Sequence, residues 1–249
     1  MSNQKFKIFR GDNNTGDYVE YSSKITEGMV VLDAILNIQA TQANDLACRW
    51  NCKAGKCGSC SMEINGKPKL ACMTRMNEYE EDETIILSPM KTFPTMRDLV
   101  TDVSWNYEQN KEIPPFSPDL EKKGERGYVM MQEDVEKVQE FRKCIECYLC
   151  QNVCHVLRDQ TTKKYFVGPR FMIRLASLVM HPLDNKDRIS DVKNKFGSGM
   201  CNITKCCTDV CPENIEITDN AIIPLKERVV DRFFDPIAML FRRIRKTFN

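Results

Sequence analysis

Thirteen cysteines in a chain of 249 residues constrain this protein more than any other feature of its sequence. The first residues, MSNQKFKIFR, lack the apolar core of a secretory signal and the pattern of an organellar transit segment, so we expect a mature cytosolic polypeptide. An odd number of cysteines in such a chain does not suit a disulfide framework. We therefore predict that the cysteines bind metal.

Charge and hydropathy exclude two other classes of protein. The chain has 36 Lys and Arg against 35 Asp and Glu, a formal net charge of +1, which provides no overall field for binding nucleic acid. The apolar stretch from Phe171 to Met180 is short and contains Arg174. We expect neither a nucleic-acid partner nor a membrane-spanning helix.

The first part of the chain has strand and hairpin signals. Alternating apolar residues flank the turn sequence GDNNTG, and Asn65-Gly66 is a second strong hairpin signal ahead of the apolar run TIIL. Between them, apolar residues recur at helical spacing from Met29 to Gln42. Two strands, a helix and three further short strands predict a β-grasp domain of the plant-type ferredoxin kind over residues 1–95.

Beyond residue 95 the strand signals stop and helical patterns replace them. Apolar stripes predict helices over 99–107 and 135–141, with PPFSP breaking the chain between them. A Gly-Pro start predicts a helix over 168–180, and another is expected over 225–234. We therefore predict an α+β protein in which residues 96–249 form an α-helical, bacterial ferredoxin-like domain.

The first group of cysteines has the ligand spacing of plant-type ferredoxins. From Cys52 the sequence reads C-x4-C-x2-C, and a further cysteine follows after eleven intervening residues. Gly55 and Gly58 let such a loop wrap tightly and direct backbone N–H groups at sulfur. Zinc is the alternative, but structural zinc sites usually show two C-x2-C pairs. The predicted 2Fe-2S ligands are Cys52, Cys57, Cys60 and Cys72.

Two later runs have the spacing of bacterial ferredoxins. The first reads C-x2-C-x2-C-x3-C, and the second is the same run with Thr204 in place of its second cysteine. In two-cluster ferredoxins the fourth cysteine of each run binds the other cluster, so one set keeps four thiolates and the other only three. The predicted ligands are Cys144, Cys147, Cys150 and Cys211 for a 4Fe-4S cluster, and Cys154, Cys201 and Cys207 for a 3Fe-4S cluster. Cys48 and Cys206 remain, and we expect them to be buried small hydrophobic residues.

The cluster order and the motifs CGSCSMEING, KLAC, CIECYLC and C-x5-C-x3-CP resemble the iron-sulfur subunit of succinate dehydrogenase and fumarate reductase over nearly the whole chain. The resemblance implies an electron relay from an FAD-containing flavoprotein subunit to quinone on a membrane anchor, which can also hold haem b. It implies a peripheral position on the cytoplasmic face of the cell membrane. The chain has no GxGxxG or P-loop motif, so we expect the flavin chemistry on another subunit and assign no catalytic residue here.

Two alternative functions remain open at this point. The same relay could serve a thiol-driven fumarate reductase or another flavin-linked oxidoreductase. A redox-sensing or metal-binding interaction protein is the alternative from a different class, and it has no reason to hold three distinct clusters.

The resemblance is weakest around the quinone site. Familiar members carry Pro, Ser and two Trp after the last cysteine of the first run, and His after the first cysteine of the second. Here those places hold residues 155–159 and Asn202. His155 adjoins a predicted 3Fe-4S ligand, so His155 and Asn202 are the candidate quinone-site residues, with a surface or capping role as the alternative for the histidine.

The C-terminal sequence FFDPIAMLFRRIRKTFN is the last feature that bears on a binding partner. Its final nine residues carry Arg242, Arg243, Arg245 and Lys246 between apolar residues and contain no acid. This pattern predicts either contact with an anionic membrane surface or a solvated tail.

Overall fold

The computed structural model describes residues 2–236, which divide into two compact units. The first unit runs to Glu108 and also takes the segments Cys144–Cys154 and Asp209–Glu213. The second unit comprises Gln109–Lys143, His155–Thr208 and the chain from Asn214 onward. Two cysteine-bearing segments from far along the chain thus pack with the N-terminal part. The boundary near residue 95 stays a prediction, since packing units and cluster-binding domains need not share their limits.

A seven-stranded mixed sheet organises the first unit. Strand β1 pairs antiparallel with β2 and parallel with β5, and the path through the sheet is β4-β3-β5-β1-β6-β7. The strands are β1 (Ser2–Asp12), β2 (Thr15–Ile25), β3 (Ser61–Ile64), β4 (Lys67–Leu70), β5 (Thr84–Ser88), β6 (Thr95–Arg97) and β7 (Val100–Thr101).

Both predicted hairpins form, and the backbone shows why. Asn13 and Asn14 have φ of 46° and 64° between β1 and β2, and Asn65 and Gly66 have φ of 48° and 74° between β3 and β4. Positive φ at both central positions gives the turn whose twist matches that of the flanking strands. The asparagine and glycine residues of the sequence therefore set these two registers.

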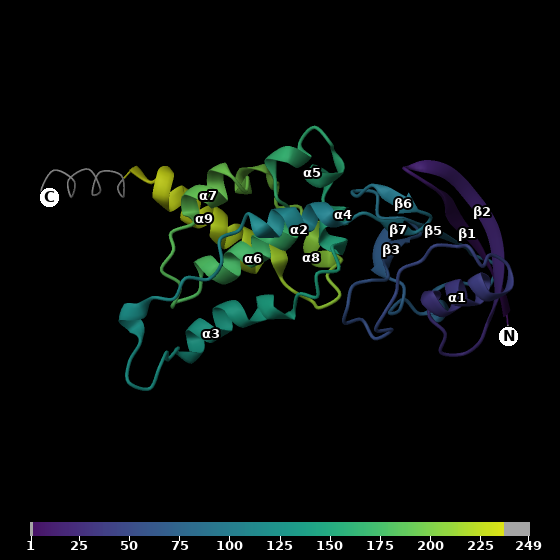
Figure 1. The fold of residues 1–249 in the computed structure, drawn as a ribbon, viewed down its shortest axis with the longest axis horizontal. Coiled ribbons are helices and arrows are strands. Elements are labelled where there is room, and N and C mark those ends of the chain that lie inside the picture. Colours follow the sequence, from purple (N-terminus) through teal and green to yellow (C-terminus); the bar gives the residue numbers. More distant parts are fainter. Residues whose placement is uncertain (1, 237–249) are drawn as a thin grey trace, which may run out of the picture. The chain divides into compact units, whose positions relative to one another are not determined.

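One helix covers the sheet core of the first unit. Helix α1 (Val31–Thr41) lies next to the long β1–β2 hairpin in Figure 1, as predicted from the apolar spacing of residues 29–42. It buries Leu32, Ile35 and Ile38 against strand residues such as Phe6 and Leu87, all almost fully excluded from solvent. Each such side chain contributes about 1.5–3 kcal/mol by burial.

The helix predicted over 99–107 is wrong at its start. Residues 100–101 form β7, which pairs with β6, and helix α2 (Ser104–Lys111) begins later. The turn between β6 and β7 has Asp98 at φ 49°, and its side chain accepts hydrogen bonds from the backbone of Gly11 and Ala47. These long-range contacts outweigh the local helical spacing, so the sheet extends beyond residue 95.

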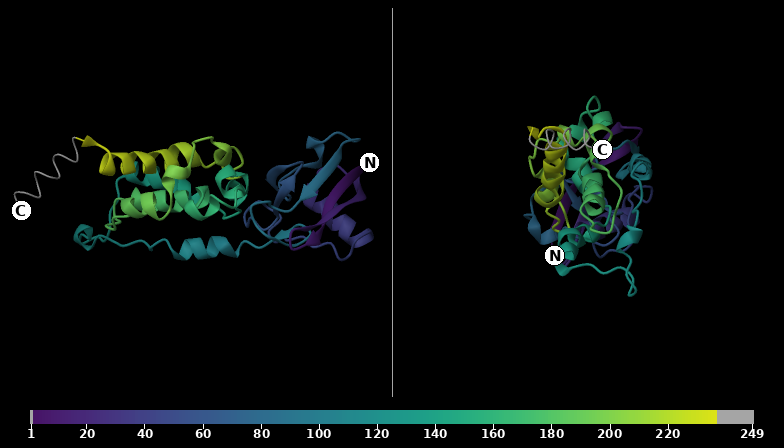
Figure 2. Two further views of the ribbon diagram at one scale, coloured as in Figure 1. Left: turned by 90° about the horizontal axis from the view of Figure 1, so that it is seen from above. Right: turned by 90° about the vertical axis from the view of Figure 1, so that its left-hand side faces the viewer.

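The second unit is helical around α6 (Pro169–Val179), where Gly168 at φ 90° precedes a proline in the first turn, as predicted. Figure 2 shows α9 alongside the other helices of this unit, and it contacts both α6 and α7. The other helices outside the first unit's core are α3 (Gln132–Gln139), α5 (His155–Arg158), α7 (Ile189–Asn194), α8 (Cys206–Asp209) and α9 (Ile223–Phe233). Shorter 3-10 and π turns connect them at Leu120–Lys122, Glu140–Lys143, Lys163–Tyr165, Ser198–Met200 and Ile217–Ile222.

A buried ion pair stabilises the loop between α6 and α7. Arg188 and Asp184 lie 2.6 Å apart, with side chains 0% and 1% exposed. The Arg188 guanidinium also donates to the carbonyl of Pro115 at 2.6 Å, within the PPFSP sequence. Removing one partner would leave a buried charge uncompensated, so this pair is a strict requirement of the local packing.

Within residues 2–236, no helix combines the length and apolar character needed to cross a bilayer. The basic residues 242–246 lie outside the described residues.

Candidate iron-sulfur centres

The loop between α1 and β3 carries Cys52, Cys57 and Cys60, and Cys72 follows β4; all four sulfur atoms lie near backbone donors. Cys52 Sγ accepts from the N–H groups of Ala54 and Lys56 at 3.4 and 3.3 Å. The Cys52 N–H lies 3.5 Å from Cys57 Sγ. Gly55 N–H points at Cys72 Sγ at 3.3 Å, and Cys72 N–H points at Cys60 Sγ at 3.4 Å. Four sulfur atoms surrounded by N–H donors are the donor set of an iron-sulfur cluster, so these residues fit the predicted group.

Protonation differs among these thiols because their surroundings differ. Burial raises the pKa of Cys57, but hydrogen bonds from Ser59 and from the Cys52 backbone outweigh it and bring the pKa to about 6. Burial raises the pKa of Cys60 to about 12. Thiolate is the form that binds iron, so cluster binding must displace the proton of Cys60.

Cys48, which the ferredoxin spacing leaves out, has a different environment. Burial alone raises its pKa to about 12, and its thiol points toward the carbonyl of Arg49 at 3.9 Å. It packs beside the hydrophobic core of the first unit. Cys48 is thus half-buried against the core, rather than fully buried as predicted.

The second group of cysteines comes together from two distant segments of the first unit. Burial, together with the nearby thiols of Cys144 and Cys211, raises the pKa of Cys147 to about 12. Cys150 lies in the short helix α4 (Leu149–Val153) and is buried. The structure thus brings Cys211 close to the first run, as the exchanged-ligand rule predicts for a 4Fe-4S set.

The two cysteine groups of the first unit are in direct contact. A Cβ atom added to Gly58 would lie 2.6 Å from the Cys147 Cα, so only glycine permits this approach. Ser61 Oγ donates to the Cys147 carbonyl at 2.9 Å. Lys56 Nζ and the Glu213 carboxylate form an ion pair at 2.9 Å. The 2Fe-2S loop therefore contacts both segments that carry the predicted 4Fe-4S ligands.

The third group is divided between the units, with Cys154 in the first and Cys201 and Cys207 in the second. Ile203 N–H points at Cys201 Sγ at 3.5 Å, and Cys207 Sγ lies 3.5 Å from Thr218 Oγ1.

Thr204 is exposed, and its hydroxyl lies 3.3 Å from Cys206 Sγ. Cys206 itself is half-buried rather than a core residue.

The two candidate quinone-site residues are both exposed. His155 begins helix α5, and Asn202 lies in the loop that follows Cys201. Their exposure leaves both side chains available to a partner, and their role stays a prediction.

No three His, Cys, Asp or Glu side chains in the described part of the chain are arranged to hold a single metal ion. None of the thirteen cysteines forms a disulfide.

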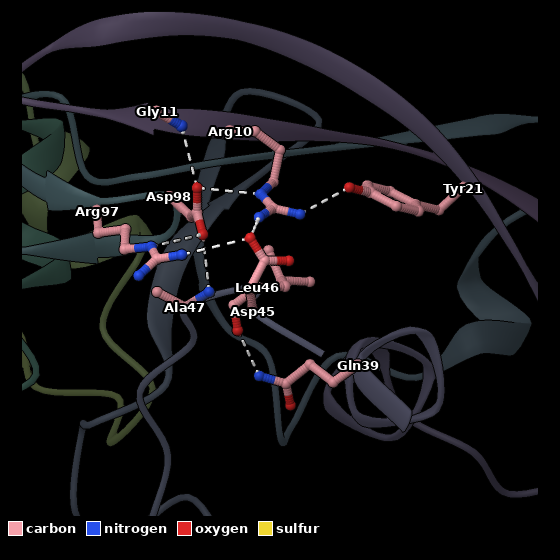
Figure 3. A network of polar contacts seen from close by, with 9 residues as sticks. All are labelled: Arg10, Gly11, Tyr21, Gln39, Asp45, Leu46, Ala47, Arg97 and Asp98. Atoms are coloured by element: carbon pink, nitrogen blue, oxygen red, sulfur yellow. Dashed lines mark hydrogen bonds and ion pairs between the residues drawn. The ribbon is translucent and has the colours of Figure 1, made fainter. Parts of the chain in front are cut away.

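Sequence reasoning missed the polar network behind the first cysteine loop (Figure 3). Asp98 is 2% exposed and accepts from the N–H groups of Gly11 and Ala47 at 3.0 and 2.8 Å and from Arg10 Nε at 3.1 Å. Arg10 also binds Asp45 at 2.6 Å, and this contact holds the pKa of Asp45 below its ordinary value. The network joins β1, the β6–β7 turn and the chain leading into Cys52. No local motif marks Asp98, because its partners are distant in sequence.

Comparisons with known proteins define the class. Residues 5–108 match the family of 2Fe-2S iron-sulfur cluster binding domains, and residues 140–215 match the family of 4Fe-4S dicluster domains. This is an iron-sulfur protein with a 2Fe-2S domain followed by a dicluster domain, which confirms the predicted fold class.

Individual relatives narrow the class further. A solved chain of the Mycobacterium smegmatis Sdh1 complex in the apo form is 58% identical with a TM-score of 0.92, covering 95% of this chain and 99% of that one. The fumarate reductase iron-sulfur subunit of Haemophilus influenzae is 31% identical over 75% of this chain and 76% of its own length. An uncharacterized iron-sulfur protein of Methanococcus maripaludis is 32% identical over 85% of this chain, and the match spans only 42% of that protein.

The chain belongs to the family of iron-sulfur subunits of succinate dehydrogenase and fumarate reductase, as the cysteine motifs predicted. It is an iron-sulfur electron-transfer subunit.

Proposed function

We propose that this chain carries electrons between an FAD-containing flavoprotein subunit and membrane quinone, in a complex that interconverts succinate and fumarate. The similarity to the Sdh1 complex chain and to the fumarate reductase subunit supports this assignment. The observation that carries it is the convergence of backbone N–H groups on four cysteine sulfur atoms beside a second cysteine group in the same unit.

The ligand assignment follows the spacing and is supported by the packing. Residues 1–95 supply the 2Fe-2S cluster, and residues 96–249 supply the other two. The proposed ligands are Cys52, Cys57, Cys60 and Cys72 for 2Fe-2S; Cys144, Cys147, Cys150 and Cys211 for 4Fe-4S; and Cys154, Cys201 and Cys207 for 3Fe-4S. When bound, such clusters accept and release single electrons at potentials set by cluster type, charge, hydrogen bonds and exposure.

The residues of the chain bind the clusters, exclude water and set the spacing between them. The Gly58–Cys147 contact keeps the first two cysteine groups at backbone contact distance, which favours transfer from one to the other. Burial of Cys60, Cys72, Cys147 and Cys150 shields their sulfur atoms from solvent.

The partners are assigned by the direction of the relay. The domain with the first cluster meets the flavoprotein subunit, and the helical domain meets a membrane anchor that holds quinone and can hold haem b. His155 and Asn202 are the proposed quinone-site residues. We accordingly propose a peripheral position on the cytoplasmic face of the cell membrane.

Iron analysis and paramagnetic resonance of the purified complex test the proposal. We expect about nine irons per chain, a 3Fe-4S signal in the oxidised protein, and 2Fe-2S and 4Fe-4S signals on reduction. A fully active complex whose undamaged chain holds only one type of cluster would contradict it.

Crosslinking tests the assignment of partners. Lys56 is a suitable anchor point, because its side chain is 69% exposed and it adjoins Cys57. We expect crosslinks from Lys56 to the flavoprotein subunit. Crosslinks to the membrane anchor alone would reverse the proposed polarity.

A further inference from the structure

A carboxylate is buried on β3, the strand that follows the first cysteine loop. Glu63 lies on β3, three residues after Cys60, and is 0% exposed. In the sheet register, Glu63 pairs with Pro68 of β4 on one side and with Ser88 of β5 on the other. A buried charge is costly unless partners compensate it, so its contacts need a reason.

Each carboxylate oxygen of Glu63 has a different partner. Its Oε1 accepts from Asn152 Nδ2 at 2.9 Å, and its Oε2 lies 2.9 Å from Lys91 Nζ. Asn152 is also 0% exposed, whereas the Lys91 side chain is 59% exposed. The carboxylate is therefore held between a buried amide and a solvent-exposed ammonium group.

The amide orientation of Asn152 is determined by a second contact. Asn152 Oδ1 accepts from the backbone N–H of Thr92 at 3.1 Å, and the Asn152 carbonyl accepts from Thr92 Oγ1 at 3.1 Å. A backbone N–H can only donate, so the oxygen of the amide faces Thr92 and its nitrogen must face Glu63. Glu63 is thereby fixed against helix α4.

Helix α4 carries one proposed cluster ligand, Cys150. Asn152 stands two residues after Cys150 and two before Cys154, and Cys150 is a proposed 4Fe-4S ligand. A charge buried in a low-dielectric interior acts more strongly on its surroundings than one in water. Cluster potentials respond to nearby charge, and a negative charge disfavours the reduced, more negative cluster.

We infer that Glu63 is a positioning residue for the 4Fe-4S site: its buried carboxylate, held on α4 by Asn152, lowers the midpoint potential of the cluster bound there. The inference rests on the proposed function, since it takes Cys150 as a cluster ligand. Lys91 opposes this effect, but its exposure to solvent weakens its share.

Redox titration of the purified complex, followed by paramagnetic resonance, tests this with two variants of opposite charge change. Glu63→Gln keeps the shape and an acceptor for Asn152, and we expect the 4Fe-4S midpoint to move to a more positive potential. Lys91→Gln leaves the carboxylate unopposed, and we expect a smaller move to a more negative potential. A role in packing alone would not give shifts of opposite sign.

Glu20→Gln is the matched control, because Glu20 forms a similar pair with Lys7 at 3.2 Å but is 74% exposed. We expect no shift in this control. An unchanged 4Fe-4S midpoint in Glu63→Gln, or shifts of the same sign in both test variants, would overturn the inference. If Glu63→Gln fails to assemble, Lys91→Gln decides by itself: a negative shift supports the inference and no shift rejects it. A wild-type complex without any 4Fe-4S signal would instead reject the proposed ligand set.

Discussion

The cysteine loops at residues 52–60 and 201–207 differ in the hydrogen-bond donors that surround their sulfur atoms. In the first loop, N–H groups of Cys52, Ala54 and Lys56 point at sulfur, and Ser59 adds a hydrogen bond to Cys57. In the second, the Ile203 N–H points at Cys201 Sγ, and side-chain hydroxyls lie beside Cys206 and Cys207. Backbone donors are fixed by the fold, whereas hydroxyls can rotate and can be replaced by mutation.

This difference shows how one chain can bind unlike clusters. In the first loop the backbone itself directs N–H groups at sulfur. The positive φ of Lys53, Gly55 and Gly58 is part of that geometry. The second loop presents an exposed threonine where its run would have a cysteine. The identity of the proposed 3Fe-4S site therefore depends on a side chain, and we expect one substitution to change it.

The largest expected effect comes from breaking the first loop. Cys52→Ser should remove the 2Fe-2S resonance signal entirely, because its sulfur accepts two backbone hydrogen bonds at a ligand position. Cys48→Ser is the control and should leave the signal unchanged, since Cys48 lies outside the ligand spacing. An unchanged spectrum in Cys52→Ser would disprove the register.

The next largest effect is expected from adding the missing cysteine to the second loop. Thr204→Cys should convert the 3Fe-4S cluster to 4Fe-4S, because residue 204 stands midway between Cys201 and Cys207, where the missing ligand belongs. The 3Fe-4S signal of the oxidised protein should vanish, and the added thiolate should lower the potential and slow delivery of electrons to quinone.

Cys206 is the competing ligand in this loop, because its sulfur lies 3.3 Å from Thr204 Oγ1. Cys206→Ser should keep the 3Fe-4S signal. Its loss in that variant, or a second 4Fe-4S signal in undamaged wild type on reduction, would identify Cys206 as a ligand.

A smaller effect should follow from separating the first loop from its neighbour. Gly58 and Gly66 both have positive φ, 66° and 74°, so alanine costs about 1 kcal/mol at either position from backbone strain. At Gly58 the new Cβ would also meet the Cys147 Cα at 2.6 Å, whereas at Gly66 nothing lies within 4 Å. That clash should add about 1–3 kcal/mol.

The measurement is the temperature at which cluster absorption is lost on heating at a fixed rate. We expect a larger fall for Gly58→Ala than for Gly66→Ala. Equal falls would mean that the contact with Cys147 is not tight in the assembled protein.

The smallest effect concerns the support behind the first loop. Asp98→Asn should lower the stability of the first unit by about 1–2 kcal/mol, because one of its buried N–H partners or Arg10 loses a charged acceptor. Asp45→Asn, which removes a 57% exposed carboxylate from the same Arg10, should cost less. Thermal loss of the 2Fe-2S absorption measures both, and a greater loss from Asp45→Asn would refute the role of Asp98.

Much of the fold could be predicted because its signals are local. The turns at 13–14 and 65–66, the helix before Gln42 and the Gly168-Pro169 helix start all rest on residues adjacent in sequence. Strand β7 could not be predicted, because the turn at Asp98 is stabilised by residues some fifty and more positions away.

The cysteine spacing by itself determined the class of protein and a full set of proposed ligands, because cluster geometry imposes fixed short separations along the chain. Only the tertiary structure decided which loops touch: that Gly58 meets Cys147, and that the Glu63 carboxylate is bound to Asn152. These contacts join residues about ninety positions apart. The energies of these contacts depend on burial and on the distances between the contacting atoms, which no local pattern of residues encodes.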